Sequence, residues 1–195
     1  MSRFSHLRAE NESKTLFGFW VYLMTDCVLF GSLFAAYAVL RNNSFGGPSG
    51  ETLFSLQFVF IQTMILLTSS FICGLGLLAA RQGNRKVVLW AFGATFILGL
   101  VFLGLEIREF SNLYREGNSW RRSGFLSAFF TLVGTHGLHI TAGLVWMSAM
   151  MYRVWSYGLT ISNVKRLTML SMFWHFLDIV WIFIFTFVYL MEFVK

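Results

Sequence analysis

The residues of this sequence that could take part in chemistry are few, and they stand inside stretches that are otherwise apolar. They are Asp26, Glu106, Glu109, His136, His139, His175 and Asp178. The last six form three pairs with i, i+3 spacing, so on a helix both members of a pair leave the same face. An unpaired charge at membrane depth costs at least a few kcal/mol, and we therefore expect these groups to face protein.

Haem iron, a di-metal centre and a proton pathway are the kinds of site that such groups build. Two haems held between membrane helices need four histidines at matched depths, but only three histidines lie in apolar stretches, and two of them share a helix face. Di-iron bundles use Glu-x-x-His on each of two helices, whereas this chain has Glu-x-x-Glu and His-x-x-His. A proton or ion pathway through Asp26, Glu106 and Asp178 is a further possible interpretation. The favoured interpretation is polar pairing between helices, at about 0.6–2 kcal/mol a pair.

The composition predicts the class of protein that holds these residues. Of 195 residues, 56% are hydrophobic and 12% charged, whereas soluble domains carry about 25% charged residues. About 20 apolar residues suffice for one helical crossing of a bilayer. Five blocks meet that length, over approximate residues 16–40, 56–80, 87–110, 124–152 and 167–194. We expect an all-α integral membrane protein, with residues 1–195 forming a single domain built as a bundle of five transmembrane helices.

The distribution of charge predicts the orientation and excludes one class of partner. With the N-terminus in the cytoplasm and the C-terminus in the periplasm, nine of the 15 Lys and Arg residues lie in cytoplasmic segments, which is the favoured arrangement. The formal net charge of +6 suits contact with anionic lipid head groups. The basic residues are scattered over short loops and form no basic helix, so we expect no nucleic-acid partner.

Four sequence motifs, in order along the chain, resemble those of a known family. They are GFWVYLMTDCVLF (18–30), LGLVFLGLEIREF (98–110), FFTLVGTHGLHITAG (129–143) and FWHFLDIVWIFIF (173–185). Together they are similar to the signatures of subunit III of the haem–copper respiratory oxidases. A lone His-x-x-His would carry little information, but four motifs in the right order are specific.

Several departures point to one branch of that family. The cytochrome c oxidase members have two further N-terminal helices, and this chain begins at what would be the third. Asp26 stands where those members have Glu, and Glu106 where they commonly have Gln. With RSGFLSAFF (122–130), these features resemble subunit III of the cytochrome o (bo-type) ubiquinol oxidases. A subunit of a cytochrome c oxidase is the alternative, since fold-level similarity alone does not fix a substrate.

The resemblance implies a non-catalytic accessory subunit of a bacterial inner-membrane complex that oxidises ubiquinol, reduces oxygen and pumps protons. It implies no catalytic residue, metal or redox cofactor in this chain, because haem and copper belong to the catalytic subunit. The expected partners are oxidase subunits I, II and IV and a phospholipid bound in a cleft between helices, and a role in proton uptake is also implied. The seven ionisable residues would then form a buried polar network or contact lipid. A standalone membrane transporter is the less favoured alternative.

Overall fold

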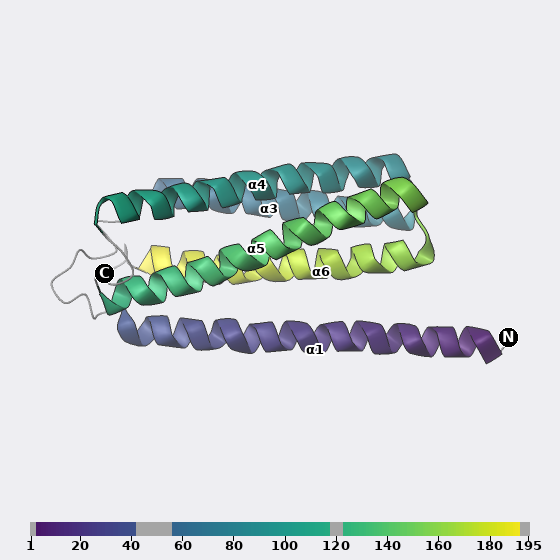
Figure 1. Ribbon diagram of the computed structural model, residues 1–195, viewed down its shortest axis with the longest axis horizontal. Coiled ribbons are helices and arrows are strands. Elements are labelled where there is room, and N and C mark those ends of the chain that lie inside the picture. Colours follow the sequence, from purple (N-terminus) through teal and green to yellow (C-terminus); the bar gives the residue numbers. More distant parts are fainter. Residues whose placement is uncertain (1–2, 42–55, 118–122, 192–195) are drawn as a thin grey trace.

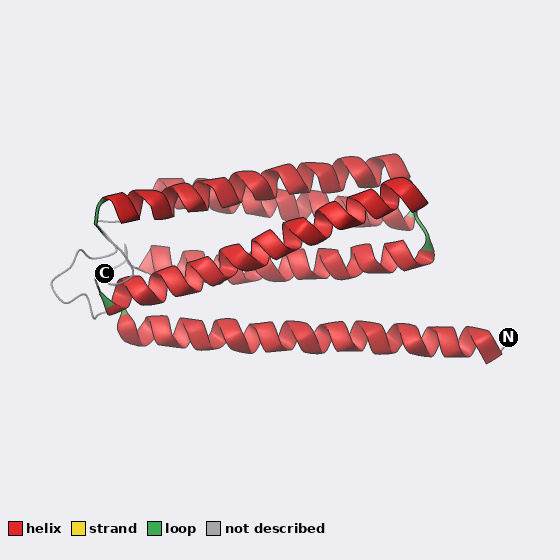
Figure 2. Cartoon of the chain, in the orientation of Figure 1, coloured by secondary structure: helices red, strands yellow, loops and turns green. Residues whose placement is uncertain are grey.

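The computed structural model describes residues 3–41, 56–117 and 123–191, and these are helical apart from short turns (Figure 1, Figure 2). The elements are α1 (Arg3–Leu40), α3 (Leu56–Arg81), α4 (Arg85–Arg115), α5 (Gly124–Tyr157), α6 (Ile161–Ile184) and the π-helix η1 (Phe185–Leu190), which continues α6. Among the described residues, five helices are long and apolar enough to cross a membrane, with α6 and η1 counted as one. The prediction of an all-helical chain with five long apolar helices is confirmed.

The helices run further than the apolar blocks of the sequence. Helix α1 begins at Arg3, α5 ends at Tyr157 and α6 begins at Ile161, whereas the apolar blocks start or stop at residues 16, 152 and 167. Once a helix is nucleated, each added residue contributes a hydrogen bond, so polar turns continue it beyond the hydrocarbon. Side chains then set the ends: Ser123 and Thr160 each accept a backbone N–H of the first turn of α5 and α6. The predicted end of the fifth block lies among residues 192–195, outside the described residues.

The five long helices are arranged as a bundle of four with one helix alongside. Helices α3 and α4 form a hairpin whose turn contains Gly83 at φ 76°, a backbone conformation that favours glycine. Helix α4 packs on α5, α5 on α6, and α6 on α3, while α1 lies along α5 and α6. In Figure 1, α1 forms the lower edge and α5 crosses in front of α6. Helix α1 begins at the opposite end of the bundle from η1 (Figure 1). Which end faces the cytoplasm stays a prediction from the charge count.

Helix α6 contributes two fully buried tryptophans to the core of the bundle, Trp174 and Trp181. Trp174 fits against α4 and α5 only because glycine faces it on both. A Cβ atom at Gly99 would lie 2.8 Å from Trp174 Cη2, and one at Gly143 would lie 3.2 Å from Trp174 Cζ3. Two turns further on, Trp181 packs edge-on against Phe102 of α4, with ring centroids 4.7 Å apart. Small residues that allow close approach are typical of membrane helix contacts.

Candidate functional site

The seam between α3 and α6 is held by polar side chains. Trp174 Nε1 donates to Ser69 Oγ at 3.1 Å, and Trp181 Nε1 donates to Thr63 Oγ1 at 3.0 Å. The earlier residue of α3, Thr63, bonds the later tryptophan of α6, and the later residue, Ser69, bonds the earlier one. The two helices therefore run antiparallel. Each buried indole N–H therefore has an acceptor, which a buried tryptophan normally requires.

His175 joins the same seam but is only half covered. Its Nδ1 lies 2.5 Å from Ser70 Oγ and 3.9 Å from Asp178 Oδ2. In a serine–histidine–aspartate triad the serine and the aspartate contact opposite ring nitrogens. Here both approach the same nitrogen, so the three residues do not form a hydrolytic triad. Asp178 is buried, whereas the His175 side chain is 44% exposed.

Asp26 and His139 connect α1 to α5 near the middle of both helices. Asp26 Oδ1 lies 3.7 Å from His139 Nε2, and His139 Nδ1 lies 2.8 Å from the carbonyl oxygen of Thr135. A carbonyl only accepts hydrogen bonds, so Nδ1 carries a proton and Nε2 is the nitrogen presented to Asp26. Tyr22, one turn before Asp26, is also close enough to interact with its carboxyl group. This contact is one of those that join α1 to the four-helix bundle, beside ring contacts such as that of Phe30 with His139.

His136 shares a helix face with His139 but occupies a different environment. It is fully buried and stacks on Trp181, with ring centroids 5.4 Å apart and planes 29° from parallel. Phe102 packs edge-on against it at 6.0 Å, and Phe30 of α1 at 6.4 Å. Within the described residues neither ring nitrogen has a hydrogen-bond partner. His136 therefore serves as an aromatic core residue in this geometry.

Glu106 and Glu109 lie towards the C-terminal end of α4. Glu106 is buried against α5 at Gly137, where an added Cβ would lie 3.1 Å from Glu106 Oε1. Neither carboxyl oxygen of Glu106 has a hydrogen-bond partner in the part of the chain that the structure describes. Glu109, one turn later, faces Gln62 of α3 and Tyr189 of η1. The two carboxyl groups thus lie in a polar cluster where α3, α4, α5 and η1 meet.

The structure therefore separates the predicted residues into local groups. Asp26 pairs with His139, His175 with Asp178, and Glu106 lies beside Glu109, while His136 joins none of these groups. Among the described residues, no three His, Cys, Asp or Glu side chains converge as metal ligands would. The sequence analysis missed the hydroxyl groups of α3 that bond α6, which are those of Thr63, Ser69 and Ser70. Thr63 and Ser70 are seven residues apart, about two turns, so they lie on one side of α3, which was an available signal, whereas Ser69 stands about 100° from Ser70 around the helix.

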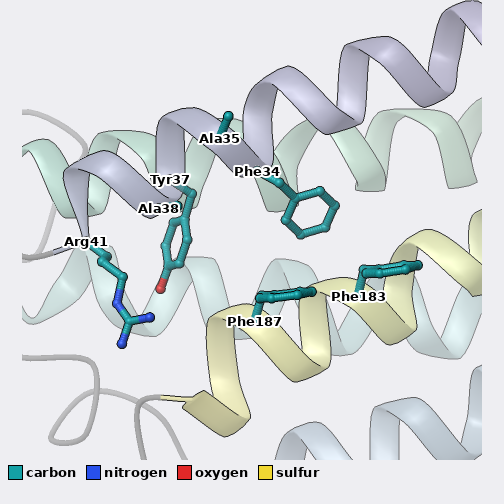
Figure 3. A pocket seen from close by; sticks show the side chains of 7 residues that line it. All are labelled: Phe34, Ala35, Tyr37, Ala38, Arg41, Phe183 and Phe187. Carbon is teal, nitrogen blue, oxygen red and sulfur yellow. The ribbon is translucent and has the colours of Figure 1, made fainter.

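A cavity of about 390 Å³ opens between the end of α1 and η1. Figure 3 shows its lining, which consists of Phe34, Ala35, Tyr37, Ala38, Arg41, Phe183 and Phe187. The aromatic rings of α1 and of the α6–η1 helix form its walls, and the Arg41 guanidinium lies at one end (Figure 3). Because Arg41 directly follows the apolar span Lys14–Leu40, this end lies near the membrane surface. An apolar cavity with one terminal cation is complementary to an anionic amphiphile.

Comparisons with known proteins give matches over nearly the whole chain. The profile of the family described as cytochrome c oxidase subunit III matches residues 6–193. Cytochrome bo(3) ubiquinol oxidase subunit 3 of Pseudomonas aeruginosa is 54% identical over 182 residues, covering 93% of this chain and 87% of the relative. Cytochrome c oxidase subunit 3 of Bacillus sp. (strain PS3) is 47% identical over 183 residues, covering 93% and 87%. Quinol oxidase subunit 3 of Bacillus subtilis is 43% identical over 185 residues, covering 94% and 90%.

Proposed function

This chain belongs to the cytochrome c oxidase subunit III family, and from that membership we propose that it is an accessory subunit of a proton-pumping terminal quinol oxidase. Its five apolar helices and its respiratory relatives identify it as a multi-pass protein of the bacterial inner membrane. The observation that carries the proposal is the 54% identity to a ubiquinol oxidase subunit over 93% of the chain.

A subunit of a cytochrome c oxidase is the second candidate, because a relative with that name is 47% identical over 93% of the chain. The two candidates differ in the electron donor and not in the role of this subunit. Glu106 favours the quinol oxidase, since the resemblance associates Gln at that position with the cytochrome c branch. Measuring oxygen uptake with each donor distinguishes them.

Within the complex, the chain supports the catalytic subunit and carries no redox centre of its own. Two features support this assignment: the separation of the histidines into different environments, and the use of His139 to bind Asp26. Pairs of this kind contribute about 0.6–2 kcal/mol each and select one helix arrangement. The proposed partners are oxidase subunits I, II and IV, with haem and copper held by the catalytic subunit. Support of proton uptake by that subunit completes the proposed role.

The cavity between α1 and η1 is the proposed site for a phospholipid. Its aromatic walls suit an acyl chain, and Arg41 at the membrane surface suits a phosphate group. Mass spectrometry of lipid retained by the purified complex tests this assignment. Arg41→Gln should reduce the retained phospholipid, whereas Arg153→Gln at the end of α5 should not. Equal retention in both variants would remove the cavity from consideration.

Affinity purification of the tagged chain in mild detergent tests the proposed function as a whole. The eluate should contain a large haem-bearing subunit, show a haem redox difference spectrum and consume oxygen with ubiquinol. Oxidase stripped of this chain should lose activity faster during turnover if the chain supports proton uptake. A colourless preparation without partner subunits would contradict the proposal and favour a standalone transporter, for which uptake into vesicles abolished by Asp26→Asn is the test.

A further inference from the structure

Glu106 is a carboxyl group buried inside the apolar span Arg85–Arg115. The residue is 3% exposed, and among the described residues neither carboxyl oxygen has a hydrogen-bond partner. By contrast, the buried carboxyl groups of Asp26 and Asp178 each have a histidine nearby, at 3.7 Å and 3.9 Å. An ionised carboxylate is strongly unfavourable when it is buried without a counter-charge or hydrogen bonds, and such a group takes up a proton instead.

The groups around Glu106 supply no compensating positive charge. The charged residue that acts on it is Glu109, which has the same sign. Arg108 is exposed and stands about 200° away around α4, on the opposite side of the helix. On α5 the contact is Gly137, where an added Cβ would lie 3.1 Å from Glu106 Oε1, and the neighbouring His136 is a fully buried ring. Two carboxylates that share a buried site oppose each other's ionisation.

The side chains around Glu109 suit a charged carboxylate better. Gln62 of α3 and Tyr189 of η1 both face Glu109, and both side chains can donate a hydrogen bond. Gln62 is fully buried, and its amide atoms have no hydrogen-bond partner in the part of the chain that the structure describes. Donors directed at a carboxylate favour its ionised form. The two carboxyl groups therefore have unequal roles, since Glu109 can carry a charge that Glu106 cannot.

We propose that Glu106 and Glu109 form a proton-binding site inside the bundle, with one proton held on Glu106 at neutral pH. The proton comes from a hydronium ion of the aqueous phase, which is left as water, and no electron is transferred. A hard metal cation suits the site less well, because it prefers about six or more oxygen ligands. The inference does not rest on the proposed function, because the burial of Glu106 and its neighbours belong to this chain alone.

Infrared spectroscopy of the purified protein, together with any oxidase subunits that accompany it, tests the proposal. A protonated carboxyl group has a C=O stretching band that an ionised one lacks, and this band moves in heavy water. Glu106→Gln replaces the acid with a neutral group of nearly the same shape and should remove one such band at neutral pH. The matched control is Glu116→Gln, an exposed residue at the C-terminal end of α4, which should leave these bands in place.

Two results of this experiment would overturn the proposal. Retention of every protonated-carboxyl band in Glu106→Gln would mean that Glu106 is ionised in the unaltered protein. A band that appeared only after sodium and calcium ions were removed would mean that a metal cation, and not a proton, neutralises the site.

Titration of the same band provides a second measurement in a variant that keeps Glu106. Raising the pH should remove the band as Glu106 loses its proton. In Glu109→Gln the band should disappear at a pH about one unit or more lower, because the like charge that opposes ionisation of Glu106 is gone. Glu116→Gln should leave the midpoint unchanged. The same midpoint in Glu109→Gln as in the unaltered protein would refute the shared site, even if Glu106→Gln failed to fold.

Discussion

Replacing Gly99 with alanine should destabilise the bundle, because Trp174 has no room to move. The new Cβ would lie 2.8 Å from Trp174 Cη2 and 2.9 Å from Leu144 Cδ2. The indole is held on its other side by Gly143 and by its hydrogen bond to Ser69. Overpacking a filled core costs about 1–3 kcal/mol. Alanine also favours a helix by up to about 1 kcal/mol over glycine, so a control must remove that contribution.

Gly104→Ala is that control, because it lies on the same helix and an added Cβ meets no atom within 4 Å. The assay is unfolding in mild detergent by titration with sodium dodecyl sulfate, followed by tryptophan fluorescence. The free energy of unfolding should be about 1–3 kcal/mol lower for Gly99→Ala than for Gly104→Ala. In a Trp174→Phe background the difference should shrink, since the two positions are in contact. Equal stability of the two alanine variants would refute the central packing role of Trp174.

Three further outcomes are expected in the same unfolding assay. Ser69→Ala removes the acceptor of the buried Trp174 N–H and should cost about 1–3 kcal/mol, with most of the loss absent when Trp174 is phenylalanine; additive losses would argue against that hydrogen bond. Gly137→Ala places a Cβ 3.1 Å from Glu106 Oε1 and should lose stability that Glu106→Ala partly restores, whereas a neutral Gly137→Ala would contradict the close approach. Arg85→Ala removes an exposed contact to a backbone carbonyl on α5 and should change stability by no more than about 0.5 kcal/mol; a larger loss would show that this contact holds α4 to α5.

Much of the architecture follows from patterns within single segments. Hydropathy predicts five long helices because lipid offers no hydrogen-bond partner, and a helix satisfies the backbone N–H and C=O groups of a span internally. The i, i+3 spacing correctly places His136 and His139 on one side of α5, and yet their neighbours differ. Residues three apart are separated by about 60° around a helix with 3.6 residues per turn, so one ring stacks on Trp181 and the other reaches Asp26.

The partners of the tryptophans were not predictable in the same way. Ser69 and Trp174 are 105 residues apart, as are Ser70 and His175. Their contact depends on which helices are neighbours and on the register between α3 and α6, and neither is encoded in the periodicity of one segment. The half-exposed position of His175 likewise depends on which helices pack against α6.

The tryptophans that α6 contributes to the core have a consequence for the biogenesis of the protein. Translation runs from the N-terminus, so α1, α3, α4 and α5 are made before the helix whose tryptophans fill the space between them. Until α6 arrives, Gly99 and Gly143 border an unfilled space, and Ser69 lacks the indole that binds it. A nascent chain that stops after Tyr157 would therefore hold four membrane helices without their core, and we expect membrane proteases to remove it. Completion of synthesis is thus the step that allows the earlier helices to reach their final packing.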